Sequence, residues 1–414
     1  MKQRNLWVTL TLINLCIVAL LGMTLRTKLL FTVRFIDFKN FLSAHSHFAF
    51  GGWVTLALMI LFITNLLTSA QQQKRTYQWI LWGIELNALG MAVTFPFEGY
   101  ALLSIIFSTL FIFFTYAFSW IFFRDLRKTS VEPLVKSLAN AALAFLVISS
   151  IGPFTLAYIL ATKTGNAILY RDAIYTYLHF QYNGFFTLSV FALFLNQLLE
   201  RSDLVSKGKI RSFVVFLCLS VVPALFLSLL WHAYNIYIRG LAIVGCALTI
   251  ITLAFFSRIA FKKTVYSIYK SSTARTLLAL SMISFTIKML LQVGTIIPSL
   301  ANAVFGYRPI IIGFLHLVFL GFVTFYILSH FIKENVFPFE KLISKTAIVF
   351  FSLAIVVNET ILLVDGIGLM FSTTNPIYAW LLWIASILLF TGACLILAAR
   401  AANFSSQPMK QVGI

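Results

Sequence analysis

The stretch SAHSHFAFGGW, residues Ser43–Trp53, decides the class of fold because it places two histidines at the head of a long apolar run. The run continues to about residue 68, and ~20 apolar helical residues are enough to cross a hydrocarbon core of ~30 Å. Comparable runs recur along the whole 414-residue chain, in which 60% of residues are hydrophobic and only 10% are charged. The mean hydropathy is +0.95, far above that of soluble domains. We therefore predict an all-α, polytopic membrane helix bundle.

These apolar runs predict about twelve transmembrane helices, joined by short loops that carry charges or turn residues. Since none of the loops is long enough for a soluble domain, residues 1–414 are expected to form a single transmembrane bundle. The N-terminal run lacks a small-residue cleavage site and is expected to be the first membrane helix. The predicted spans are 6–24, 42–68, 77–95, 98–123, 138–161, 173–198, 213–232, 238–258, 275–296, 309–331, 345–364 and 376–399.

The basic residues predict the orientation of the bundle. Of the 31 Lys and Arg residues, 22 fall in the loops on the same side as the two termini, 8 fall on the opposite side, and Lys288 lies within span nine. Because cytoplasmic loops are enriched in Lys and Arg, both termini are expected to be cytoplasmic. The net charge of +19 is explained in this way, so it does not indicate a nucleic-acid partner.

The four cysteines narrow the redox chemistry that the chain can carry. Cys16, Cys218, Cys246 and Cys394 lie singly in apolar segments, and neither C-x-x-C nor C-x-x-C-H occurs. The sequence therefore indicates neither a redox dithiol nor a covalently attached c-type haem.

Most of the histidines share one depth in the predicted bundle. With the termini inside, five of the six lie in the outer third: His45, His47, His179, His232 and His316. The sixth, His330, falls at the cytoplasmic end of span ten and is expected to be an interfacial residue. For any single histidine, an ordinary hydrogen-bonded position at a helix end is the alternative interpretation.

Histidines at equal depth on different helices favour a haem site. Ionisable side chains within spans tend to face the bundle interior, and an iron atom accepts neutral imidazole nitrogen. Two imidazoles can bind the same iron from opposite sides if they lie at the same depth, as His45 or His47 does with His316. Glycines follow in HSHFAFGGW, HFQYNG and HLVFLG, where they permit close approach of a flat macrocycle or of a neighbouring helix.

These residues resemble the catalytic subunit (subunit I) of the haem–copper oxidase superfamily, nearest to its nitric oxide reductase and cbb3-type branches. The resemblance covers nearly the whole chain as architecture, with histidines on spans two, six, seven and ten. It implies a low-spin haem b whose axial ligands are His45, or else His47, and His316. Arg308 and Arg239 are expected on the outer side, where they would meet the haem propionates or, alternatively, lipid headgroups.

The resemblance also implies an incomplete binuclear centre. His179 and His232 match copper-ligand positions, so copper is a second candidate cofactor. Phe314 and Trp231, however, stand where the family has histidines, and Asn183 stands where the nitric oxide reductases have glutamate. We therefore expect the low-spin haem site to be intact and the gas-reducing centre to be eroded.

Two further ionisable residues fall inside predicted spans. Lys288 lies within FTIKMLLQVG of span nine, and Glu85 lies within GIELNALG of span three. Such residues are expensive in a bilayer and often functional, so a proton path or a quinone contact is one interpretation. A buried structural ion pair between Lys288 and Glu85 is the preferred one.

We expect a membrane b-type haem protein that serves electron transfer or oxygen and nitric oxide respiration, sensing or detoxification, in a bacterial inner (cytoplasmic) membrane. Its implied partners are the lipid bilayer, a quinol or cytochrome electron donor and small subunits. Whether it is a haem-dependent oxidoreductase stays open. The alternatives are an active terminal oxidase or nitric oxide reductase with unusual ligands, and a haem-free transporter or copper-handling protein.

Overall fold

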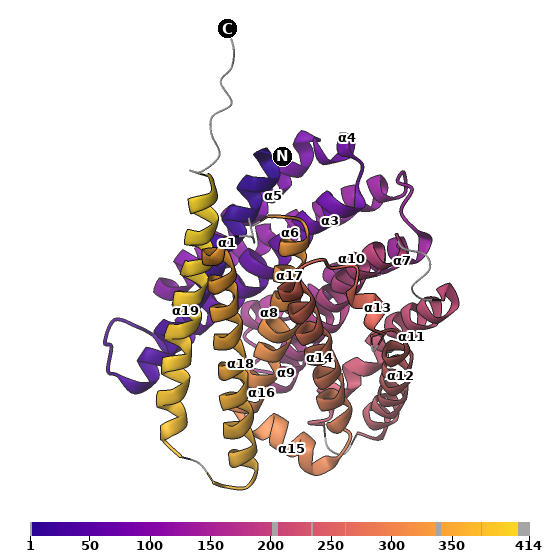
Figure 1. Ribbon diagram of the computed structural model, residues 1–414. Helices are drawn as coiled ribbons and strands as arrows, with labels where there is room; N and C mark the ends of the chain where they lie inside the picture. Colours follow the sequence, from indigo (N-terminus) through magenta and orange to yellow (C-terminus); the bar gives the residue numbers. More distant parts are fainter. Residues whose placement is uncertain are drawn as a thin grey trace.

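The computed structural model describes residues 2–200, 206–232, 235–260, 262–336, 341–373 and 375–404. Within these ranges the secondary structure is helical, and twelve helical stretches are long and apolar enough to cross a membrane. The predicted all-α polytopic bundle is thereby confirmed (Figure 1). Arg201 and Lys410, which the charge count places on the cytoplasmic side, lie outside the described residues.

The twelve spans follow the predicted order, and several of them consist of more than one helix. They are α1 (Lys2–Leu30); α2 (Phe38–Phe48), η1 (Ala49–Thr55) and α3 (Leu56–Leu66); α5 (Arg75–Glu98); α6 (Leu102–Leu126); α7 (Pro133–Ser149) and α8 (Ile151–Thr162); α9 (Ala167–His179), η2 (Phe180–Phe186) and α10 (Thr187–Leu199); α11 (Lys207–Leu225) and η3 (Phe226–Leu229); α12 (Ile236–Ala260); α14 (Ser272–Gly294); α16 (Arg308–His316), η4 (Leu317–Thr324) and α17 (Phe325–Lys333); α18 (Leu342–Met370); and α19 (Ile377–Phe404). Short helices α4 (Ser69–Gln72), α13 (Lys263–Tyr266) and α15 (Pro298–Gly306) lie in the connections.

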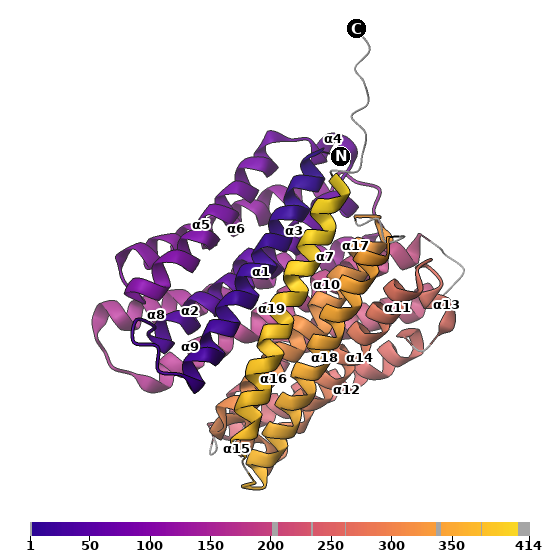
Figure 2. The ribbon, with the colours of Figure 1, turned by 60° about the vertical axis from the view of Figure 1, so that its left-hand side comes forward.

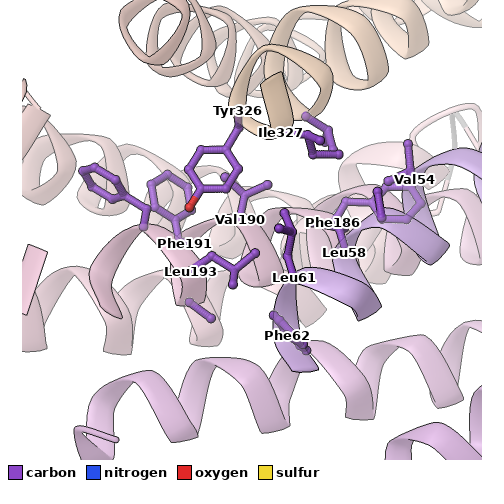
Figure 3. Close-up of a cluster of buried hydrophobic side chains, with 14 of the residues drawn as sticks. Val54, Leu58, Leu61, Phe62, Phe186, Val190, Phe191, Leu193, Tyr326 and Ile327 are labelled. Carbon is purple, nitrogen blue, oxygen red and sulfur yellow. The ribbon is translucent and has the colours of Figure 1, made fainter. Parts of the chain in front are cut away.

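Spans two and six form the centre of the bundle. In their most apolar windows 83% and 89% of residues are buried, whereas the corresponding shares in the other spans range from 22% to 50%. The outer spans keep apolar side chains on their surfaces, as lipid contact requires. Figure 3 shows the core between α3, α10 and α17, where Phe62, Phe191 and Ile327 are buried among other apolar side chains.

In three spans the backbone changes from α-helical to π-helical geometry just after a histidine. The π-helical segments η1, η2 and η4 follow His47, His179 and His316 within one or two residues. Their aromatic side chains meet: the Phe50 and Phe319 ring centroids are 4.4 Å apart, and Phe186 lies 5.6 Å and 5.4 Å from them. π segments are rare and are found mostly at functional sites. Three of them around one aromatic cluster therefore make this region of the bundle a candidate for a functional site.

Each π segment receives a side-chain hydrogen bond on a backbone carbonyl. The change from α-helical to π-helical spacing alters which backbone N–H donates to each carbonyl. In each segment one carbonyl accepts a hydrogen bond from a side chain. The donors and acceptors are Asn14 Nδ2 to Gly52 O (2.7 Å), Thr187 Oγ1 to Tyr182 O (2.6 Å) and Ser281 Oγ to Phe322 O (2.7 Å).

The two ends of the described chain lie on the same face of the bundle. The Arg400 guanidinium near the end of α19 donates to the Asn5 side chain (2.9 Å) and to the Val336 carbonyl, and Arg4 lies 3.8 Å from Glu334. In Figures 1 and 2 this face, which also carries α4, is at the top. The termini therefore share one side, and the assignment of that side to the cytoplasm stays a prediction.

The structure differs from the predicted spans in local detail. Span five is interrupted at Ser150, between α7 and α8. Span seven was expected to end at His232, but the helical stretch ends at Leu229 and His232 lies in the following turn. The periodicity also gave no indication of α15, a short helix between spans nine and ten that begins at Pro298.

Candidate functional site

His45 of α2 and His316 of α16 lie close enough for a charge on one imidazole to act on the other. Each ring is fixed through Nδ1, which lies 3.1 Å from the Val18 carbonyl in His45 and 2.8 Å from the Ile312 carbonyl in His316. Neither Nε2 atom has a partner among the described residues. A histidine that ligates a metal commonly donates its other ring N–H to a backbone carbonyl, so both rings are held as metal ligands are held.

A glycine on α1 creates the room that His45 needs. A Cβ atom at Gly22 would lie 3.1 Å from His45 Cε1, so the imidazole rests directly on the α1 backbone. The Val18 carbonyl that holds the ring lies one helical turn earlier, on the same face of α1. The sequence alone did not single out Gly22, because nothing in it shows that span one packs against span two here.

His47 lies on another side of α2 and has a partner at each ring nitrogen. Its Nδ1 is 2.8 Å from the Ser43 carbonyl, and its Nε2 is 3.4 Å from the Tyr100 hydroxyl. Burial raises the pKa of Tyr100 to about 12, so the phenol keeps its proton and donates to the imidazole. The His47 ring also packs against Phe95 at 4.6 Å. Of the two α2 histidines, His45 is the one within electrostatic reach of His316, and its Nε2 has no partner among the described residues.

The positive charge nearest to this histidine pair comes from a residue that the sequence reasoning missed. Arg26 of α1 is close enough to act electrostatically on both His45 and His316, and it also interacts with Asp365 of α18. Arg308, at the start of α16, lies 5.3 Å from the Phe38 ring at the start of α2 and so stands at the outer end of the same two helices.

Arg239, in contrast, is exposed near the start of α12. That helix packs mainly against α11 and also contacts α14 and η3. The structure therefore places Arg26 and Arg308 near the histidine pair, and it places Arg239 on a separate part of the bundle.

His179 uses both ring nitrogens within the protein. The ring is fully buried, its Nε2 is 2.7 Å from the Val221 carbonyl, and its Nδ1 is 3.2 Å from Asn183 Nδ2. The Asn183 amide also donates to Gln292 Oε1 (3.0 Å). Asn183 thus takes part in a hydrogen-bond network that joins spans six, seven and nine.

His232 pairs with a carboxylate from span six. Its Nε2 lies 2.9 Å and 3.1 Å from the two oxygens of Asp172. Trp231 stacks on the His232 ring at 4.0 Å and on the Arg171 guanidinium at 4.6 Å. Within the described ranges, no group of three or more His, Cys, Asp or Glu side chains is arranged to hold a metal ion. His179 and His232 are each engaged with other groups instead.

The expected ion pair between Lys288 and Glu85 is absent, because each residue has a different partner. Lys288 Nζ donates to Thr187 Oγ1 (2.8 Å) and lies 5.6–5.7 Å from three aromatic ring centroids. Glu85 accepts from Asn14 Nδ2 (2.8 Å), and the same amide holds the Gly52 carbonyl of η1. Both residues are thus connected to π segments, Lys288 to η2 through Thr187 and Glu85 to η1 through Asn14.

His330 is not interfacial, as was expected, but fully buried. Its Nδ1 lies 2.5 Å from Gln197 Nε2, and the Gln197 carbonyl accepts from the Tyr269 hydroxyl (2.7 Å). Its place near the end of span ten suggested exposure, but Tyr269, in the connection after α13, is linked to the ring through Gln197.

The glycines after the histidines serve the packing of neighbouring side chains. A Cβ atom at Gly52 would lie 2.6 Å from the Phe48 ring, one at Gly184 would lie 2.5 Å from Phe145 Cβ, and one at Gly321 would lie 2.8 Å from Ser284 Oγ. Of the two interpretations open from the sequence, Gly184 and Gly321 show close packing against a neighbouring helix, whereas Gly52 makes room for Phe48 of its own span.

Comparison with protein-family models gives no match for this chain, and comparison with curated proteins gives none either. The case for a function therefore depends on the fold and on the geometry around His45 and His316.

Proposed function

We propose that the chain is a membrane haem protein in which His45 and His316 are the two axial ligands of one low-spin haem b. The observation that carries the proposal is that the two imidazoles lie within electrostatic reach of each other, and that each is anchored through Nδ1 and has no partner at Nε2 among the described residues. Neutral imidazole nitrogen is the donor that haem iron accepts in such sites. The burial cost of two histidines inside a membrane bundle is offset when both bind a metal.

The residues around the pair suit a haem. Both histidines are only partly buried, and neither Nε2 atom has a partner among the described residues. Arg26 adds positive charge within reach of both imidazoles, and Arg308 stands eight residues before His316 on α16, so both cations would favour a ligand that carries carboxylates. Below the pair, the cluster of Phe50, Phe186 and Phe319 closes the site with apolar surface.

The proposed role is electron transfer. A haem held by His45 and His316 would supply one-electron chemistry, and using both histidines as ligands would favour electron transfer over gas binding. The arrangement supports membership of the haem–copper oxidase subunit I superfamily as a proposal, together with a place in a bacterial inner membrane and a quinol or cytochrome as electron donor. Small partner subunits belong to the same proposal.

A copper centre is not included in the proposal. The contacts of His179 with Val221 and Asn183, and of His232 with Asp172, would have to break before either ring could bind copper. Phe314, at the position of the family's other iron ligand, packs at 5.3 Å against the Tyr182 ring. These contacts favour a haem protein without a gas-reducing centre over an active oxidase.

The test is the optical spectrum and haem content of the full chain, purified from cells with ample haem. We expect one haem b per chain and a low-spin b-type spectrum. His45→Ala and His316→Ala should each abolish that spectrum, because each removes one of the two iron bonds.

The matched control is His47→Ala, two residues from His45, which should keep the full haem content. A colourless wild-type protein would overturn the proposal and leave a haem-free transporter or copper-handling protein. A second haem, or a carbon monoxide-sensitive spectrum with bound copper, would replace the proposal by an active oxidase or nitric oxide reductase.

A further inference from the structure

Span ten borders a second site on a different face from His316. A cavity of about 450 Å³ lies between span ten and spans six, seven, nine and eleven, and Gly313, Phe314, Leu317 and Gly321 form the wall that span ten contributes. This volume falls within the range of small-molecule pockets, ~300–1,000 Å³.

The cavity opens sideways into the bilayer. Ile283 and Ile287 of α14 and Val356 and Leu363 of α18 all line it, and all four are also exposed on the outer surface of the bundle. Figure 1 shows α14 and α18 as neighbouring upright helices, with α15 below them. Since the exposed lining residues come from these two helices, the opening lies between them, at a level where the surroundings are lipid chains.

The α15 region forms one end of the cavity. Leu300, Val304 and Phe305 of this region contribute to the lining. The exposed lining residues, in contrast, include Ile283 and Ile287 of α14 and Val356 and Leu363 of α18, which are apolar and suit contact with lipid chains.

One wall of this apolar cavity carries a carboxyl group. Glu359 lines the cavity and is partly buried, and it lies 11 residues before the end of α18, which corresponds to about 16 Å along the helix. One carboxyl oxygen accepts from Asn358 Nδ2 at 3.0 Å. No Lys, Arg or His is among the described residues that line the cavity. A carboxyl group at this depth is costly unless a hydrogen-bond donor reaches it.

Other polar groups lie on different walls. The side chains of Gln292 on α14, Ser228 on η3 and Tyr182 on η2 contribute to the lining, and Ser228 Oγ lies 3.2 Å from the Tyr182 hydroxyl. A fitting occupant thus has an apolar body, a hydrogen-bond donor for Glu359 and a second polar atom across the molecule. A plain acyl chain has no donor, and a phospholipid keeps its polar head at the interface.

We propose that this cavity binds a membrane-soluble quinol. One ring hydroxyl donates to the Glu359 carboxyl, the opposite ring oxygen meets the hydroxyl pair of Ser228 and Tyr182, and the apolar tail leaves between α14 and α18. The role of this quinol as electron donor to the haem rests on the proposed function. The binding of the quinol does not rest on it, because none of the cavity residues is a proposed haem ligand.

The test is binding of decylubiquinol to the full chain in phospholipid nanodiscs, measured by equilibrium partition and by competition with an azido-quinone photolabel. We expect saturable binding, with the label attached to α14 and α18. Glu359→Leu, which replaces a carboxyl group in lipid by an apolar side chain and so should not impair folding, is expected to weaken binding about 10-fold. Ile287→Trp, which narrows the opening, should weaken it by a similar factor.

The matched controls are Asp365→Asn, a carboxyl change on the same helix outside the cavity lining, and Leu219→Trp, an equivalent enlargement on the lipid-facing surface of α11. Both should bind as wild type. Wild-type affinity in the haem-free His316→Ala variant is expected and separates this proposal from the preceding one. Absence of saturable binding, labelling elsewhere, or stronger displacement by dodecylamine than by decylubiquinol would overturn it.

Discussion

At the scale of single residues, His45 and His316 are anchored in different ways. His316 is held by the Ile312 carbonyl four residues earlier in its own helix, so its orientation is fixed wherever span ten lies. His45 is held by the Val18 carbonyl of another span, and its ring rests on Gly22. The position of one proposed ligand thus depends on how α1 packs against α2.

This difference predicts the effect of a change at Gly22. Gly22→Leu should push the His45 ring away from the Val18 carbonyl and weaken haem binding about 10-fold, as expected when a supporting contact of a metal ligand is lost. Haem titration of the purified apoprotein gives the affinity. Gly240→Leu, at an open position on α12, is the control and should bind as wild type. Unchanged affinity in Gly22→Leu would show that α1 does not position His45.

At the scale of helical elements, the three π segments explain several buried polar residues together. Asn14, Thr187 and Ser281 are isolated polar positions in apolar spans, and each donates to a carbonyl of a π segment. Glu85 and Lys288 in turn bond to two of these donors. The polar groups inside this bundle therefore support the irregular backbone beside the proposed haem site.

A buried asparagine tests this interpretation. Asn14→Leu removes the donor to both Gly52 O and Glu85, and it should lower stability by about 2–3 kcal/mol, because two buried acceptors lose their partner. Denaturation in mixed detergent micelles measures the change. Asn87→Leu, whose amide bonds only to the Gly83 carbonyl of its own helix, should cost less than about 1 kcal/mol.

The double variant with Glu85→Leu completes the test. It removes the carboxyl group that Asn14→Leu leaves without a partner, and it should recover part of the lost stability. Equal effects of Asn14→Leu and Asn87→Leu, with no recovery in the double variant, would contradict a role for Asn14 in supporting η1.

The elements also show where prediction from the sequence ends. Apolar length predicted the twelve spans, because a membrane requires it of every helix. The π segments were not predicted, since a change of helical spacing over seven or eight residues leaves no separate pattern in a run that is apolar on all sides. The predicted ion pair between Lys288 and Glu85 was wrong for a related reason. The depth of a residue in the membrane follows from its position in a span, but the residue that lies opposite it depends on how the helices pack.

At the scale of the whole molecule, the bundle is closed by contact between its first and last spans. Helix α1 packs against α19, and the Cys16 thiol lies near enough to Cys394 for the two groups to interact. The same neighbours place Arg26 beside the histidine pair and Arg400 against Asn5. Neither Arg26 nor Gly22 was singled out from the sequence, because the neighbour of span one cannot be read from the chain order.

The contact between α1 and α19 predicts a specific cross-link. A lipophilic oxidant should join Cys16 to Cys394 in a disulfide, with two thiol protons and two electrons lost to the oxidant. In a Cys218→Ser/Cys246→Ser background, proteolysis should then leave N- and C-terminal fragments that separate only after reduction. No cross-link should form with Cys394→Ser. Its absence with both thiols present would contradict the packing of α1 on α19.

Span ten contributes residues both to the proposed haem site and to the cavity. His316 is within electrostatic reach of His45 and does not line the cavity, while Gly313, Phe314 and Leu317 border it, so a helix about 10–12 Å wide takes part in both places. Two bound redox molecules on either side could not collide or exchange atoms, yet electrons tunnel across such a thickness of protein. Span ten would then keep the lipid-soluble donor and the iron centre apart sterically. Electrons could still pass between them, but the two molecules could not react directly.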